Sequence, residues 1–269
     1  MRHILSAVVL SAVAIGLLGQ DPPHTPAIQG LDHIPIAVND LEGAAARYRE
    51  LGFALKPGRP HEDGIRNEHV KFRDGTELEL ITAPAATDAL TSTYRRHLAA
   101  GDGPAFLAFF APSTTRTAVA PEALPDYVFL SGRNLSPTDR PEHFAHPNTA
   151  ESFVGVWLAA GDLSKERQLL ESTGAMFTEE DVRVPDAVRA PVAHLAEGDV
   201  VFLPASRQLI PGRPIVGATL RVRSVETARS LIERIAGARL VSFSSRRRSS
   251  VFLPPSLTHG LWLELRQAS

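Results

Sequence analysis

The stretch LDHIPIAVNDLEGAAARYRELGF, residues 31–53, decides the fold. Its first eight residues alternate as in a strand, which places His33 on one face and the isoleucines beside it on the other. Asn39 or Asp40 can cap a following helix, whose apolar residues recur at helical spacing. Gly52 stands where a C-terminal glycine would end that helix. The stretch therefore predicts a strand followed by an amphipathic helix.

Three strand-like segments follow this helix, at residues 53–56, 69–72 and 77–82. The order is therefore βαβββ. In the last strand, Leu78 and Leu80 alternate with Glu77 and Glu79, so the glutamates share the face of His33. One face of the predicted sheet packs on the helix, and the other carries a histidine and carboxylates.

The pattern recurs at residues 153–174 and 215–237, which makes an internal repeat. In each copy the predicted helix cap stands seven residues after one position of the first strand. The caps are Asp40, Asp162 and Ser224, and the corresponding strand positions, used below as landmarks, are His33, Gly155 and Gly217. The closing strands keep the same spacing, with Glu79, Phe202 and Glu264 lying 46 or 47 residues after these landmarks. Residues 104–134 form a degenerate copy, in which threonines and Pro121 disfavour a regular helix.

These repeats predict an α+β fold of βαβββ modules arranged in two paired-module domains. The first domain spans residues 30–135, a linker spans 136–152, and the second domain spans 153–267. We expect consecutive modules to pair, because HPNTA in the linker is typical of a boundary between two closed halves. The alternative, in which module one pairs with module four, would bring Glu264 into one cup with His33.

Composition narrows the range of functions. The 269 residues carry a formal net charge of −2 and no cysteine. The charge gives no reason to expect a nucleic acid or an acidic membrane as a partner, and the missing cysteine excludes disulfides, thiolate metal sites and cysteine nucleophiles.

Arg2 and His3 precede an apolar run shorter than the roughly 20 residues of a membrane span. We interpret residues 1–20 as a cleavable signal peptide, with an uncleaved anchor as the alternative, and expect a periplasmic or secreted protein.

Paired βαβββ modules with this histidine and glutamate resemble the vicinal oxygen chelate superfamily, in particular its glyoxalase-like branch. The segments that carry the resemblance are residues 31–53, GRPHEDGIRN, DGTELELI, HPNTA and HGLWLEL. The superfamily includes glyoxalases, epimerases, extradiol dioxygenases, thiol transferases and metal-free proteins that sequester antibiotics. The resemblance implies a cup-shaped sheet with a divalent metal, held by side chains of the first and last strands.

By this resemblance, His33 and Glu79 are metal ligands, and Glu79 also serves as a catalytic base. Imidazole and carboxylate ligands suit zinc, manganese, nickel or iron(II). Glu264 is the metal-ligand candidate of the fourth module, and Asn134, just beyond a strand end, is not counted. Three further ligand positions hold residues that bind no metal, namely Gly155, Gly217 and Phe202. A hydrogen-bonded pair without metal is the alternative for His33 and Glu79.

Four residues of the rim loop and third strand are candidates for substrate contact: His61, Arg66, Asn67 and His69. Ordinary loop polarity and a half-exposed sheet histidine are the alternatives. We predict an exported, metal-dependent enzyme of lyase, isomerase or dioxygenase type, acting on a small molecule with adjacent oxygens. A non-catalytic binding protein of the sequestration type is the alternative. In a third interpretation the second half is a scaffold or a dimer surface, which leaves a homodimer open.

Overall fold

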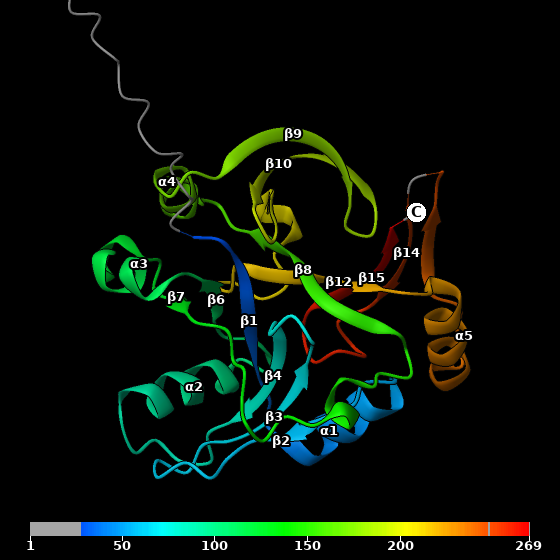
Figure 1. The fold of residues 1–269 in the computed structure, drawn as a ribbon, viewed down its shortest axis with the longest axis horizontal. Coiled ribbons are helices and arrows are strands. Elements are labelled where there is room, and N and C mark those ends of the chain that lie inside the picture. Colours follow the sequence, from blue (N-terminus) through cyan, green and yellow to red (C-terminus); the bar gives the residue numbers. More distant parts are fainter. Residues whose placement is uncertain (1–27, 247, 269) are drawn as a thin grey trace, which may run out of the picture.

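The structure, a computed structural model, describes residues 28–246 and 248–268. These residues form two mixed sheets, the first built from residues 30–131 and the second from residues 150–268 (Figure 1). The predicted signal peptide, residues 1–20, lies outside the described residues. No helix in the described part is long and apolar enough to cross a membrane.

The first sheet is built around β1, which the opening stretch predicts. Its order is β2 (Lys56–Pro57), β3 (Arg66–Lys71), β4 (Glu77–Thr82), β1 (Gly30–Ala37), β6 (Leu107–Phe110) and β7 (Val128–Ser131), with β5 (Gly103–Pro104) beside β1. Helix α1 (Leu41–Glu50) begins after Asp40, whose carboxylate accepts a hydrogen bond from the Gly43 N–H. Gly52 follows the helix at a φ of +83°, a conformation that glycine adopts readily. The prediction for this stretch is confirmed.

The second sheet repeats the same connectivity twice. Its order is β13 (Val241–Ser244), β14 (Arg248–Leu253), β15 (Trp262–Ala268), β12 (Ile215–Val222), β8 (Ala150–Ala159), β11 (Gly198–Leu203), β10 (Ala187–Leu195) and β9 (Met176–Arg183). Helix α4 (Ser164–Ser172) follows β8, and α5 (Val225–Ala236) follows β12. Short 3-10 helices occur at Pro121–Ala123, Pro141–Phe144 and Ala205–Arg207. The α+β fold of repeated βαβββ modules is therefore confirmed.

In each sheet, the first strands of its two modules lie adjacent and antiparallel. These are β1 and β6 in the first sheet, and β8 and β12 in the second. Modules one and two thus share the first sheet, and modules three and four share the second. The division into domains at residues 136–152 stays a prediction, and β8 begins inside that stretch, at Ala150.

Two helices of the first half differ from the sequence prediction. Helix α2 (Ala89–Ala99) lies between the first two predicted modules, where we expected no helix, and a capping box of Asp88 and Thr91 begins it. Helix α3 (Ser113–Ala118) forms one short helix in the degenerate module, where we expected none. It ends before Pro121, which cannot continue a helix.

Strand register corrects one landmark. The sequence alignment places Phe202 of β11 at the position of Glu79 in β4. In the structure Val201 is the equivalent residue, since it pairs with Trp157 as Glu79 pairs with Pro35. A shift of one residue in a strand moves the side chain to the other face of the sheet, so Phe202 faces the helix side. The third module still offers no metal ligand at this position.

One hydrophobic core combines the helix-side faces of both sheets. It includes apolar residues of the strand face that the sequence predicts to pack on the helix, namely Ile34, Ile36, Val38, Leu78 and Leu80. Residues of β8, β12, β15 and α5 belong to the same core. The two halves of the chain therefore share apolar burial, which dominates the favourable free energy of folding.

The opposite faces of the two sheets differ in chemistry. On the second sheet this face carries an apolar cluster with Trp157, Val192 and Phe252, beside the buried Glu264. On the first sheet it carries His33 and Glu79, and α2 covers the end of this face. The pairing of a histidine with a glutamate places the candidate site on the first sheet.

Candidate functional site

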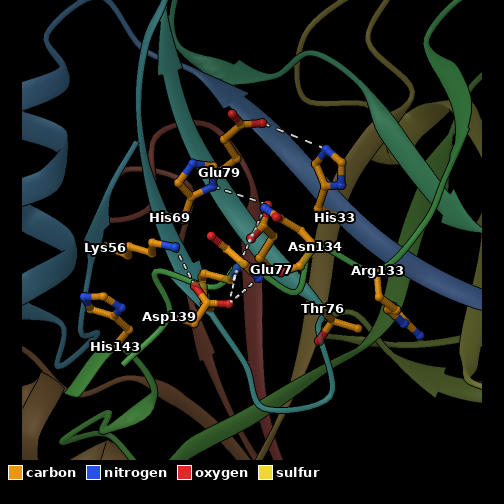
Figure 2. Close-up of polar contacts among 12 residues, drawn as sticks. His33, Lys56, His69, Thr76, Glu77, Glu79, Arg133, Asn134, Asp139 and His143 are labelled. Carbon is orange, nitrogen blue, oxygen red and sulfur yellow. Dashed lines mark hydrogen bonds and ion pairs between the residues drawn. The ribbon is translucent and has the colours of Figure 1, made fainter. Parts of the chain in front are cut away.

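Three neighbouring strands bring two histidines and two glutamates together on the polar face of the first sheet (Figure 2). His33 of β1 lies opposite Glu77 of β4, and Glu79 lies opposite His69 of β3. Residues paired across a sheet place their side chains side by side on one face. The structure thus brings His33 and Glu79 together, as strand alternation predicts.

The imidazole of His33 is held by Asp32. Its Nδ1 lies 2.7 Å from Oδ2 of the buried Asp32, so Nδ1 donates and the lone pair of the neutral ring is on Nε2. Nε2 faces Glu79, with its Oε2 at 3.9 Å. Burial by itself would lower the pKa of His33, but the hydrogen bond to Asp32 and the charges of Glu79 and Glu77 raise this pKa above 6.5.

Glu79 is fixed from its other side by Asn67. The Asn67 side-chain amide donates to Oε1 of Glu79 at 2.5 Å, which leaves Oε2 directed toward His33. Glu79 is nearly buried, and removing a carboxylate from water is costly unless it is hydrogen-bonded or paired with a cation. The arrangement is suited to holding a cation between the two side chains.

A second histidine–glutamate pair lies beside the first. Nδ1 of His69 is 3.3 Å from Oε1 of Glu77, and the Asn134 amide donates to both oxygens of Glu77. Burial would lower the pKa of His69, yet Glu77 raises it above the ordinary value. Burial would raise the pKa of Glu77, but His69, His33 and Asn134 together lower it. Both shifts widen the pH interval in which Glu77 is ionised while His69 is protonated.

A buried lysine completes the polar cluster, which the sequence analysis did not identify. Lys71 is 1% exposed, and its Nζ donates to the Asn134 carbonyl at 2.5 Å and to Oδ2 of Asp139 at 2.9 Å. The other oxygen of Asp139 accepts from Lys56 at 2.5 Å. Burial opposes ionisation of Asp139, but hydrogen bonds from Lys56, the Ser136 N–H and Lys71 lower its pKa to about 2.

The sequence contains a signal for Lys71 but none for Asp139. Lys71 shares the face of His69 by strand alternation, so the period of two could have indicated it. Asp139 stands in an irregular linker, where no periodicity predicts which way a side chain points. Its contact depends on a chain path that only the folded molecule defines.

A pocket of about 560 Å³ lies beside the cluster. It is lined by Lys56, Pro57, Gly58, Arg59, His61, Asn67, His69, Lys71, Asn134, Ser136 and Thr138. Neither His33 nor Glu79 lines it, but Asn67 lies in its wall and contacts Glu79. The pocket size is typical of small-molecule sites.

Three of the four predicted substrate-contact residues line this pocket, and Arg66 does not. The Arg66 guanidinium lies 3.0 Å from the carboxylate of Glu42 in α1. Arg66 precedes Asn67 in β3, so alternation turns its side chain to the opposite face. Arg66 therefore lies outside this pocket, because it belongs to a strand and not, as the sequence analysis assumed, to the rim loop.

The structure also separates Glu264 from the other two predicted metal ligands. Glu264 lies in β15 of the second sheet, where it accepts from the hydroxyls of Thr219 at 2.8 Å and Ser250 at 2.5 Å. Arg266 lies 3.2 Å from its carboxylate. These neighbours satisfy a buried carboxylate, and the set of His33, Glu79 and Glu264 is not assembled.

The donors at the first sheet fit a divalent metal ion. An imidazole Nε2 and a carboxylate oxygen face each other, and a carboxylate on Nδ1 is the usual outer partner of a metal-binding histidine. Among residues 28–246 and 248–268, no group of three His, Cys, Asp or Glu side chains is arranged to hold a metal. His33 and Glu79 would thus leave coordination positions for water or substrate.

Comparisons with known proteins agree with the fold. A family model described as "Glyoxalase-like domain" matches residues 31–187, more than half of the chain. No curated protein matches the chain. Among solved structures, a variant of 4-hydroxymandelate synthase from Streptomyces coelicolor is similar, with a TM-score of 0.62, 16% identity and coverage of 90% of this chain and 93% of that one.

Two dioxygenase structures are also similar. A variant of homoprotocatechuate 2,3-dioxygenase from B. fuscum has a TM-score of 0.58 and 11% identity, with 91% of this chain and 73% of that chain covered. The 2,2',3-trihydroxybiphenyl 1,2-dioxygenase from Sphingomonas wittichii has a TM-score of 0.54 and 13% identity, with 90% and 91% covered. At these identities the likenesses establish the fold and not the reaction.

Proposed function

Because the chain belongs to the glyoxalase-like domain family of the vicinal oxygen chelate superfamily, we propose that it is a divalent-metal-dependent enzyme acting on a small molecule with two adjacent oxygens. One observation carries this proposal: the Nε2 atom of His33, oriented by Asp32, faces the carboxylate of Glu79. Lyase, isomerase and dioxygenase chemistry are all compatible with it. The dioxygenase folds of the structural relatives support this range.

His33 and Glu79 would hold the metal, which when bound would act as a Lewis acid toward the substrate oxygens. The chain's other residues have separate tasks. Asp32 keeps the proton of His33 on Nδ1, and Asn67 keeps one oxygen of Glu79 turned toward the metal position. Glu79 is also the candidate base, since a carboxylate beside a pocket can accept a proton from the substrate. Asn67 connects the pocket to the His33–Glu79 pair, because it lines the pocket and donates a hydrogen bond to Glu79.

Metal content of purified variants tests this proposal. We expect the protein, dialysed against zinc, manganese, nickel or iron(II) and then against buffer, to retain one of these metals. His33→Ala and Glu79→Gln should each lose it, because each removes one of two protein ligands. Glu264→Gln is the matched control and should retain it, since Glu264 lies in the other sheet. Full metal retention in the first two variants would contradict the proposal.

A non-catalytic small-molecule-binding protein is the second candidate. It is favoured by the absence of a three-ligand group in the described part of the chain, since two ligands alone give a weak site. A parent protein that binds no metal but still binds a ligand in the 560 Å³ pocket would support this candidate over the first.

We also propose, from the sequence alone, that the protein is exported to the periplasm or medium. Its basic start and short apolar run support a signal peptide at residues 1–20. N-terminal sequencing of the exported protein should begin near Gln20. An intact Met1 would contradict cleavage.

A further inference from the structure

The pocket beside the metal position has a one-sided charge. Five of its lining residues are basic, namely Lys56, Arg59, His61, His69 and Lys71, and none is Asp or Glu. A concave site lined by one sign of charge raises the local concentration of oppositely charged ligands.

Internal ion pairs cancel only part of this charge. Asp139 is shared, because one carboxylate binds both Lys56 and Lys71. Glu77 is the next carboxylate, 3.9 Å from Lys71, and it also pairs with His69. The two lysines therefore contact these two carboxylates, of which Glu77 is shared with His69, and Arg59 is a third permanent cation of the lining.

Arg59 is the cation that remains available. It is exposed at the pocket wall and forms no ion pair within the described residues. A guanidinium offers a planar pair of donors that matches a carboxylate in a bidentate geometry.

His61 adds an unsatisfied polar atom to the same wall. Its Nε2 is buried and has no hydrogen-bond partner in the structure. Buried polar atoms are hydrogen-bonded in the large majority of cases, so an orphaned one indicates a missing partner. In the tautomer with its proton on Nε2, an acceptor on a bound ligand satisfies it.

We propose that the ligand of this pocket is a small organic acid whose carboxylate is bound by Arg59 and His61, with Lys56 and Lys71 supplying the surrounding positive potential. This inference rests on the proposed function in placing the substrate beside His33 and Glu79. The adjacent oxygens required there are then an oxygen of the acid and one on its neighbouring carbon. A 2-hydroxy acid is the simplest molecule with these features.

Isothermal titration of the full chain, freed of metal with a chelator, tests the inference with mandelate as the probe. Mandelamide is the matched neutral probe, since it differs only in replacing the carboxylate by an amide. We expect mandelate to bind at least about tenfold more tightly than mandelamide, with an affinity that falls as salt rises. Equal binding of the two probes, or no mandelate binding up to about 10 mM, would overturn the inference.

Two arginine variants locate the binding. Arg59→Gln should weaken mandelate binding by about tenfold, whereas Arg66→Gln should leave it unchanged, because Arg66 pairs with Glu42 outside the pocket. Equal loss in both variants would mean a general charge effect and overturn the assignment to Arg59. Inorganic phosphate is the third probe, and phosphate binding more tightly than mandelate would overturn the choice of a carboxylate.

The result is separable from that of the metal experiment. If the protein retains metal but binds mandelate no more tightly than mandelamide, this inference is contradicted and the proposed enzyme function is not. A second outcome is also possible: the parent protein holds no metal, and His33→Ala and Glu79→Gln still bind mandelate. That result would support this inference and favour the binding-protein candidate over the enzyme.

Discussion

At the scale of single residues, the main feature of the site is that three carboxylates act on one histidine. Asp32, Glu77 and Glu79 all act on His33 and raise its pKa, although burial opposes this. The negative charges of these carboxylates favour a cation at His33, whether a proton or a metal ion. Because a metal must displace the proton from the imidazole, metal binding at His33 should strengthen as pH rises.

Replacing Glu77 by Gln tests this electrostatic account. Glu77 raises the pKa of both histidines, so its loss should lower both values, that of His69 more than that of His33. NMR titration of the imidazole protons in chelator-treated protein measures the shift. Glu62→Gln, in the exposed rim loop, should leave both values in place. Unchanged values in Glu77→Gln would mean that burial and the remaining carboxylates determine the pKa alone.

At the scale of elements, β4 connects the site to the core. All six of its residues are buried, with Leu78 and Leu80 in the shared core and Glu77 and Glu79 in the site. The side-chain period of two ties these roles together, since a slip of one residue would exchange the two faces. Burial of the leucines therefore holds the glutamates in register with His33.

Leu78→Ala should destabilise the protein by roughly 2–5 kcal/mol, because it removes buried methyl groups and leaves a cavity. Urea denaturation measures the change. Leu90→Ala is the control, since Leu90 in α2 is 47% exposed and its truncation should change stability by less than about 0.5 kcal/mol. Equal midpoints for the parent and Leu78→Ala would show that the assigned face of β4 is incorrect.

At the scale of the whole molecule, the two halves are joined by more than the linker. Their helix-side faces form one core, and the buried hydroxyl of Tyr48 in α1 donates to the Thr258 carbonyl at 3.1 Å. His259 and Asp102 form a further pair between the halves at 2.8 Å. The second sheet therefore packs against the first through this shared core.

The chain should therefore unfold in one transition, with equal calorimetric and van't Hoff enthalpies, although its two sheets are separate. Differential scanning calorimetry measures this. Tyr48→Ala should lower the midpoint of the entire transition, and Tyr48→Phe should lower it less because the ring remains packed. Two resolved transitions, or a shift confined to part of the signal, would mean that the halves fold independently.

The local patterns of the sequence determined the βαβββ modules and, within the site, the placement of His33 and Glu79. Alternation placed His33 and Glu79 on one face, and Asp40 and Gly52 marked the ends of α1. These features depend on neighbouring residues, whose relative directions follow from backbone geometry alone. Alternation was not applied to Arg66, because the start of β3 was assigned to a loop, and the strand turns this side chain away from the pocket.

Only the tertiary structure decided which distant residues complete the site. Asn134 and Asp139 reach Glu77 and Lys71 from an irregular segment, which has no period from which a direction can be read. Glu264 matches the spacing of a ligand, yet module pairing places it in the other sheet. Strand pairing and loop paths depend on contacts far apart in the chain, which compete through packing of the whole core rather than through local preference.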